Sequence, residues 1–204
     1  MGGGKLEKQS KYVRYNQTLV QTARLPEETE ELLLRFGLPQ LRLDDENLLG
    51  IHFKPLTEQG LIRTRDDRKT LLPIGYEYEE TSAILGLETD VGTLYRVDVQ
   101  TGDYSLMNSN LTLFIEFLQR YAAFINENSE SYEPTVMTLE QAQAKLAAFR
   151  RGEIIPSQQS SSQSARKLVL KQLRLLFVEK DPMSVLNEDT WWSVVLEQLE
   201  DDLL

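Results

Sequence analysis

The stretch from Leu48 to Val99 constrains the fold most, because short apolar runs with β-branched and aromatic residues alternate there with Gly, Pro and Asp. This pattern is typical of several short β-strands separated by turns. The turn residues Thr101-Gly102-Asp103 extend the series with a hairpin, so successive strands should pair antiparallel. The expected strands are Leu49 to Lys54, Thr70 to Glu77, Ser82 to Glu88, Thr93 to Val99 and Asp103 to Met107.

One expected strand shows a clear alternation of side-chain character. Tyr95, Val97 and Val99 alternate with Arg96 and Asp98. Successive side chains of a strand point to opposite faces of a sheet. The alternation therefore predicts a sheet with one buried face and one wet face, as is common in antiparallel sheets.

Helices are expected before and after the strands in the sequence. Leu25-Pro26 followed by acidic residues predicts a helix start, and Gly37 and Pro39 predict its end. After Asn108-Ser109, apolar residues recur at spacings of three and four, which predicts a helix that covers one face of the sheet. This stripe comprises Leu111, Phe114, Leu118, Tyr121 and Ile125.

The last third of the chain predicts further helices around a low-complexity segment. We expect a helix from Thr138 to Arg150, and a flexible Ser/Gln-rich loop over residues 156–165. Beyond the loop, apolar periodicity predicts one helix that ends near Asp181-Pro182 and another that contains Trp191 and Leu199.

Together these patterns predict the class and the organisation of the chain. We expect a single α+β domain in which helices pack a mostly antiparallel sheet. Residues 1–24 would form an N-terminal tail and lead-in, residues 25–155 the core and residues 156–165 the flexible loop. Residues 166–204 would form C-terminal helices that dock on the core, because two such apolar helices must bury their faces.

Composition limits the partners and the compartment. The 204 residues carry a net charge of −10, which disfavours nucleic acid as a ligand and favours association with a basic protein. The absence of cysteine excludes disulfides and thiolate metal sites. Neither a signal sequence nor a membrane-spanning run is apparent, so we expect a cytoplasmic protein that does not bind membranes.

The sequence shows no convincing catalytic, cofactor or metal motif. His52 is the only histidine, and no nucleophile elbow or dinucleotide fingerprint accompanies it. Acidic clusters such as Asp44-Asp45-Glu46 and Asp66-Asp67 lack the spacing of a calcium loop. The basic run of Arg63, Arg65, Arg68 and Lys69 is best explained as a charged turn between strands. We therefore expect no catalytic residue, no cofactor and no metal.

Several motifs, taken in order along the chain, resemble the SUKH superfamily, and within it the fourth immunity-protein subfamily. The similarity runs from Leu25 to Phe124 and from Val178 to Leu199. The resemblance implies a non-enzymatic α+β immunity protein that binds and neutralises a cognate bacterial toxin, often a nuclease or deaminase. The matching residues are Leu38-Pro39, Ile74-Gly75, Leu85-Gly86-Leu87, Gly92 to Val97, Asn108-Ser109, Leu118 to Tyr121, Asp181-Pro182 and Trp192.

Three functions remain open from the sequence. The first is an immunity protein that uses the acids Glu77, Glu79, Glu80 and Asp98 on a wet sheet face or cleft. The second is a general protein-interaction adaptor, since a shared fold does not fix function. The third is a metal-dependent hydrolase that uses Asp66 and Asp67. The sequence does not identify the toxin or the oligomeric state.

Overall fold

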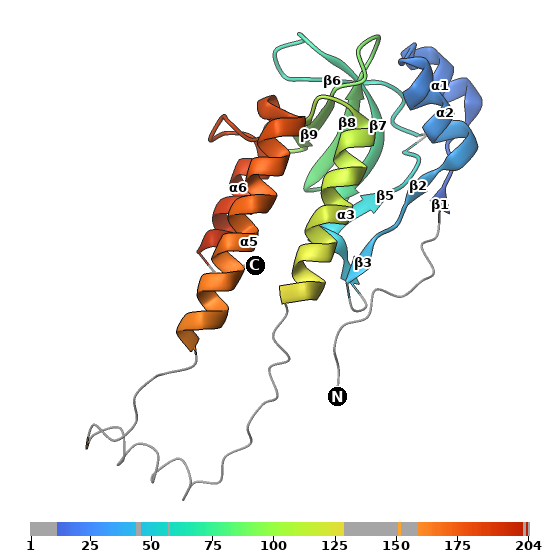
Figure 1. The fold of residues 1–204 in the computed structure, drawn as a ribbon. Helices are drawn as coiled ribbons and strands as arrows, with labels where there is room; N and C mark the ends of the chain where they lie inside the picture. The colour runs from blue at the N-terminus through green and yellow to red at the C-terminus, as the bar shows by residue number, and fades with distance from the viewer. Residues whose placement is uncertain are drawn as a thin grey trace, which may run out of the picture.

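A six-stranded antiparallel sheet forms the centre of the molecule (Figure 1). The computed structural model describes residues 12–43, 46–56, 58–128, 151, 159–201 and 203. The strand order is β10-β9-β8-β7-β5, and β6 pairs with a separate part of β7. The strands are β5 (Ile51–Phe53), β6 (Ile62–Arg63), β7 (Thr70–Glu77), β8 (Ala83–Glu88), β9 (Leu94–Asp98) and β10 (Tyr104–Asn108).

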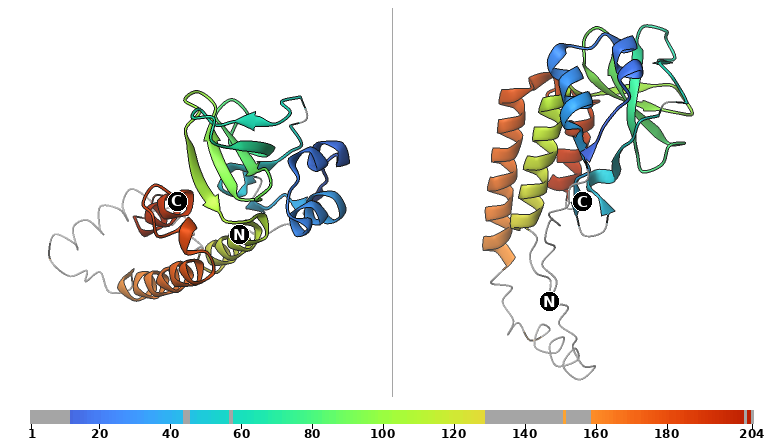
Figure 2. Two further views of the ribbon diagram at one scale, coloured as in Figure 1. Left: turned by 90° about the horizontal axis from the view of Figure 1, so that it is seen from above. Right: turned by 90° about the vertical axis from the view of Figure 1, so that its right-hand side faces the viewer.

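Three long helices lie on one side of the sheet, in two layers (Figures 1 and 2). They are α3 (Leu111–Asn128), α5 (Gln159–Lys180) and α6 (Trp191–Glu200). Aromatic rings join α3 to β5 and to α6, as Phe114 contacts Phe53 and Trp191. α5 packs on α3 and α6 through Phe177, which stacks on Phe117 at 3.8 Å and meets Trp192 at 5.0 Å.

The N-terminal elements lie beside β5 and β7, at the other edge of the sheet from α5 and α6 (Figure 1). Two short antiparallel strand pairs and several short helices form the N-terminal part and the connections between the longer elements. The elements are β1 (Tyr12–Val13) paired with β2 (Leu38–Pro39), α1 (Gln17–Ala23), α2 (Glu27–Glu31), the π-helix η1 (Leu32–Phe36), β3 (Arg42–Leu43) paired with β4 (Glu46–Asn47), and the 3-10 turns η2 (Leu48–Gly50) and η3 (Pro182–Ser184).

The fold confirms the expected α+β class and most of the expected strands. β7 has the expected bounds, and β8, β9 and β10 differ from expectation by about one residue at their ends. β5 is shorter, because Leu48–Gly50 forms a 3-10 turn in which Leu49 has φ 53°. The expected helix that ends at Gly37 is present, although its last turn is a π-helix that leaves Phe36 exposed.

The expected division into a buried face and a wet face is wrong in part. Leu71, Ile84 and Val97 are buried on the face that points away from the helices. The connection from β6 to β7 folds toward the β9–β10 turn, where the Arg65 N–H donates to the Gly102 carbonyl at 3.2 Å. This contact covers part of the face that points away from the helices. Because the two residues are distant in sequence, the contact leaves no local periodic signal.

Two expected segments differ from the structure. Residues 12–24, expected as tail and lead-in, include β1 and α1, and the Asn16 side chain caps α1. The expected loop over 156–165 is wrong from Gln159 onward, where α5 begins. No Pro or Gly interrupts the chain between Pro156 and Asp181, so a helix anchored by its packed apolar part extends back through Ser and Gln. The helix expected from Thr138 lies outside the described residues.

A buried polar network joins the C-terminal helices to the sheet. The carboxylate of Asp181, which is 1% exposed, accepts from Asn108 Nδ2 at 2.9 Å and from the Ser109 N–H at 2.8 Å. Asn108 Oδ1 in turn accepts from the indole of Trp192 at 2.7 Å. The network therefore connects the ends of β10 and α5 with the starts of α3 and α6.

Replacing Asp181 should destabilise the whole fold. In Asp181→Ala the buried side chain of Asn108 and the part-buried N–H of Ser109 lose their acceptor, which costs about 1–3 kcal/mol for an unsatisfied buried group. Urea denaturation followed by tryptophan fluorescence would measure the loss. The exposed neighbour Glu179 is the control, and Glu179→Ala should change the unfolding free energy by less than about 0.5 kcal/mol. Equal effects of the two substitutions would contradict this role.

Candidate functional site

The four acids expected to bind a partner lie at one end of the sheet. Glu77 ends β7 and Asp98 ends β9, and both align with Ala83 of β8 in the strand register. Glu79 and Glu80 follow in the turn between β7 and β8. Residues aligned across neighbouring strands share a face of the sheet. The structure thus brings the acids to one region, although their surroundings differ.

Glu77 is an internal anchor and does not lie on a wet face. Its carboxylate accepts from the Trp191 indole at 2.8 Å and from Arg96 Nε at 2.6 Å. The side chain is buried, and the ion pair with Arg96 is largely shielded from water. Glu77 therefore holds α6 against the end of the sheet, and its charge is compensated inside the molecule.

The other three acids are more accessible. Glu79 is exposed and forms no ion pair or side-chain hydrogen bond among the described residues, whereas Glu80 pairs with Lys54. Asp98 Oδ1 accepts from the N–H groups of Thr101 at 2.8 Å and Gln100 at 2.9 Å. The bond from Thr101, supported by that from Gln100, holds the pKa of Asp98 below its ordinary value. Asp98 thus organises the β9–β10 turn, and Glu79 is the most available of the four.

A cleft opens beside these acids, between the end of the sheet and α6. It has a volume of about 340 Å³, and we name it the α6 cleft. Glu77 and Arg96 contribute from the sheet, and Val194 contributes an exposed apolar side chain from α6. A cleft with an apolar wall and acids nearby resembles the centre and rim of a protein interface more than a small-molecule pocket.

Tyr78 is the feature of this cleft that sequence reasoning missed. Its side chain is 63% exposed, and its backbone has φ 58°, a left-handed conformation that is rare for bulky residues. The ring lies over Gly50, where a Cβ atom would approach the Tyr78 ring to 2.5 Å. No Gly or Asn in the turn signals this conformation. An exposed aromatic ring held by a strained backbone is typical of functional surfaces.

A second groove continues the α6 cleft along β10. It has a volume of about 540 Å³, and we name it the β10 groove. Ser105 and Asp189 line both cavities, so the two form one continuous surface. The outer wall of the groove carries Met183 and Leu186, which are 68% and 69% exposed. Exposed apolar residues gathered beside acids indicate an interaction surface.

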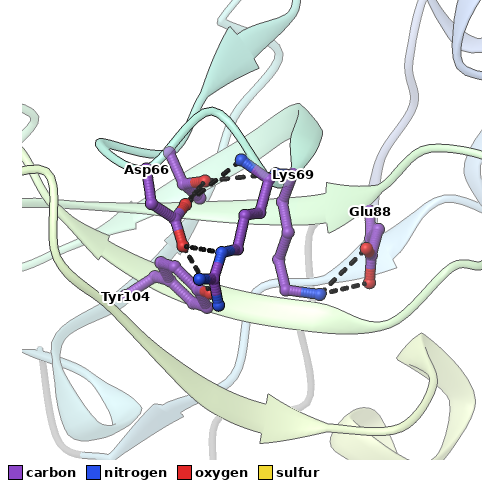
Figure 3. Close-up of polar contacts among 6 residues, drawn as sticks. Asp66, Lys69, Glu88 and Tyr104 are labelled. Carbon is purple, nitrogen blue, oxygen red and sulfur yellow. Dashed lines mark hydrogen bonds and ion pairs between the residues drawn. The ribbon is translucent and has the colours of Figure 1, made fainter.

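A separate polar cluster lies near the β6–β7 connection (Figure 3). Lys69 Nζ donates to both carboxylate oxygens of Glu88, at 2.9 and 3.0 Å, and lies 4.5 Å from the centre of the Tyr95 ring. The Thr64 hydroxyl donates to Asp66 at 2.6 Å and holds the pKa of Asp66 below its ordinary value. These charges are compensated within the cluster, which therefore stabilises the sheet.

The geometry gives little support to a hydrolase that uses Asp66 and Asp67. The oxygens of Asp66 are engaged by Thr64, Arg68 and Tyr104. Within the part of the chain that the structure describes, no group of three or more His, Asp and Glu side chains is placed to hold a metal ion. The basic run is a charged turn, as expected, because each of its cations pairs with a nearby acid.

His52 has the surroundings of a structural residue. Its ring stacks on Tyr76 at 4.7 Å, and Nδ1 lies 2.6 Å from the Asn47 side-chain nitrogen. Burial, together with the charge of Arg42, lowers the pKa of His52. A neutral, stacked imidazole fits a structural role in the pairing of β5 with β7.

The lowered pKa of Asp98 predicts a pH-dependent contribution to stability. A depressed folded-state pKa contributes stability above the unfolded value of about 3.8, and this is lost as the pH falls through the folded value. Asp98→Asn should therefore be less stable than the wild type near pH 7, and the difference should shrink near about pH 3. Urea denaturation at both pH values would measure it. Glu79→Gln is the control and should have the same stability as the wild type at both pH values. An Asp98→Asn protein as stable as the wild type at neutral pH would disprove the prediction.

Comparisons with known proteins agree with the fold and the sequence motifs. No curated protein and no solved structure matches the chain. Among the described helices, none is long and apolar enough to cross a membrane. The model of the SUKH-4 immunity protein family matches residues 7–198, which include every strand described above and every helix except the last two residues of α6. The chain therefore belongs to the SUKH-4 immunity protein family.

Proposed function

We propose that this chain is an immunity protein that neutralises a cognate bacterial toxin by stoichiometric binding, without catalysis of its own. The match to the family over residues 7–198 carries this proposal. The α6 cleft and the β10 groove support it, because together they offer an apolar surface with acids around it. The site of action would be the cytoplasm, where the toxin would meet its target.

The charge of the molecule favours a basic toxin domain. The net charge is −10, and exposed acids such as Glu79, Glu188 and Asp189 lie on or beside the proposed surface. An enzyme that acts on nucleic acid needs a cationic face, and such a face would be attracted to this surface. We therefore propose a nuclease or a nucleic-acid deaminase as the toxin.

Tyr78 would be the central anchor, with Glu79, Glu80 and Asp98 around it. Aromatic residues with large exposed area are common at the energetic centres of interfaces. Nearby acids would steer the toxin and fix its orientation, which affects the association rate more than the affinity. Glu77 would act indirectly, since its bonds to Trp191 and Arg96 hold both walls of the cleft.

Affinity capture from the native cells, under conditions in which a toxin is expressed, tests this function. We expect stoichiometric recovery of one protein with a toxic domain, and co-expression of the present chain should suppress the lethality of that domain. Recovery of only unrelated cellular complexes would reject the immunity role and favour the adaptor function.

Removing the Tyr78 ring should weaken toxin binding without unfolding the protein. Alanine, like tyrosine, has a Cβ atom that disfavours positive φ. The substitution Tyr78→Ala therefore tests the ring and not the backbone conformation. We expect the dissociation constant to rise by about 30-fold or more, the effect of losing roughly 2 kcal/mol at an interface centre. Calorimetric titration would measure it.

Tyr12→Ala is the matched control for this substitution. Tyr12 is 59% exposed on β1, which lies far from α6 (Figure 1). Its removal should change the dissociation constant by less than about twofold. Similar losses in both variants, or no loss in Tyr78→Ala, would exclude Tyr78 as the anchor.

A further inference from the structure

β10 forms a free edge of the sheet. It is the terminal strand in the order β10-β9-β8-β7-β5, so only one of its sides pairs with another strand. The free side of an edge strand presents unpaired N–H and C=O groups, and proteins usually shorten, bend or cover it. Here the β10 groove runs beside this edge, and Tyr104, Ser105 and Leu106 form its strand side.

The register shows which backbone groups of β10 face the groove. The Asp98 N–H donates to the Asp103 carbonyl at 2.9 Å, so these two residues form a hydrogen-bonded pair. Such pairs alternate with non-hydrogen-bonded pairs along an antiparallel ladder. Tyr104 aligns with Val97 and Leu106 with Tyr95, which makes both of them non-hydrogen-bonded pairs. The N–H and C=O groups of Tyr104 and Leu106 therefore point away from β9.

These outward groups have no backbone partner among the described residues. The segment across the groove forms its backbone bonds within itself, as Val185 and Leu186 donate to the Pro182 carbonyl. That segment contributes Met183 and Leu186 as exposed apolar side chains. A groove with a free strand edge on one side and apolar side chains on the other fits an added extended chain, which would pair with the edge and bury alternate side chains.

Charge distinguishes between the occupants of such a groove. Asp189 lines the groove and Glu188 precedes it, and neither acid takes part in an ion pair in the described part of the chain. A second copy of this chain would bring the same acids and a further net charge of −10 to the contact. A different protein with a basic residue beside an apolar strand would instead complement them.

We propose that the β10 edge binds an extended segment of the protein partner as an additional strand. The segment would carry alternating apolar side chains that contact Met183 and Leu186, and a Lys or Arg that pairs with Asp189. This inference rests on the proposed function in one respect, since the segment would belong to the same toxin that contacts Tyr78. Because β10 is short, the added strand would gain only a few backbone hydrogen bonds, and the side chains would supply the remaining affinity.

The first test uses a library of random dodecapeptides displayed on phage and the whole immobilised protein. We expect selected peptides to alternate apolar residues and to contain Lys or Arg. Their binding should fall by about tenfold or more on Leu106→Pro, which removes one outward N–H, and should persist on Leu106→Ala, which retains it. Proline is tolerated at edge positions whose N–H faces outward, so the variant should fold.

The paired variant Met183→Asp with Leu186→Asp tests the other side of the groove without altering the strand. It should also abolish peptide binding, because charged side chains would replace the apolar contacts. Peptides that bind Leu106→Pro and this variant as well as they bind the wild type would overturn the proposal, as would a library that yields no binders. A concentration-dependent dimer that Leu106→Pro abolishes would assign the edge to a second copy and would also overturn it.

Hydrogen exchange in the toxin complex separates this inference from the proposed function. Amide exchange at Tyr104 and Leu106 should slow by roughly tenfold or more when the toxin binds. A complex that protects the Tyr78 turn and leaves these two amides unchanged would support the immunity function and reject strand addition. Peptides that bind the edge of a chain that protects against no toxin would reject the immunity function and support the edge site.

Discussion

The position of α5 and α6 on the sheet depends first on the buried carboxylate of Asp181, to which Glu77 adds a second contact with α6. Asp181 satisfies the side chain of Asn108 and the N–H of Ser109, and Asn108 then positions the indole of Trp192. The aromatic rings around Trp192 pack only when the two C-terminal helices have this placement. The α6 cleft lies between α6 and the end of the sheet, and the β10 groove lies between β10 and the segment that joins α5 to α6, so the proposed binding surface depends on the network that joins these elements.

The strands of the central sheet could be predicted from the sequence because local signals agreed. Apolar runs gave the bounds of β7, and turn residues separated β9 from β10. The extent of α5 could not be predicted, because its Ser/Gln-rich start resembles a linker and the packing that supports the helix comes from distant residues such as Phe117. Tertiary contacts overrode local preference in this case.

The candidate site was predictable in outline only. The acids at the ends of β7 and β9 were identified, and the antiparallel register brings them to one region. Their roles were not predictable, because Glu77 is bonded to Trp191, a residue 114 positions away. Tyr78 gave no signal, since no Gly or Asn in its turn marks the left-handed backbone, and Gly50, which its ring covers, is distant in sequence.

The order of synthesis gives the position of α6 a further meaning. A chain is synthesised from its N-terminus, and a domain generally folds as a unit. α6 follows every other described element, yet it supplies Val194 to the cleft and Trp192 to the network that fixes the helices. The residues of the sheet and of the Tyr78 turn are therefore translated before that helix. Nascent chains would therefore lack the proposed binding surface, and under the proposed function only finished copies would protect against a toxin that arrives during translation.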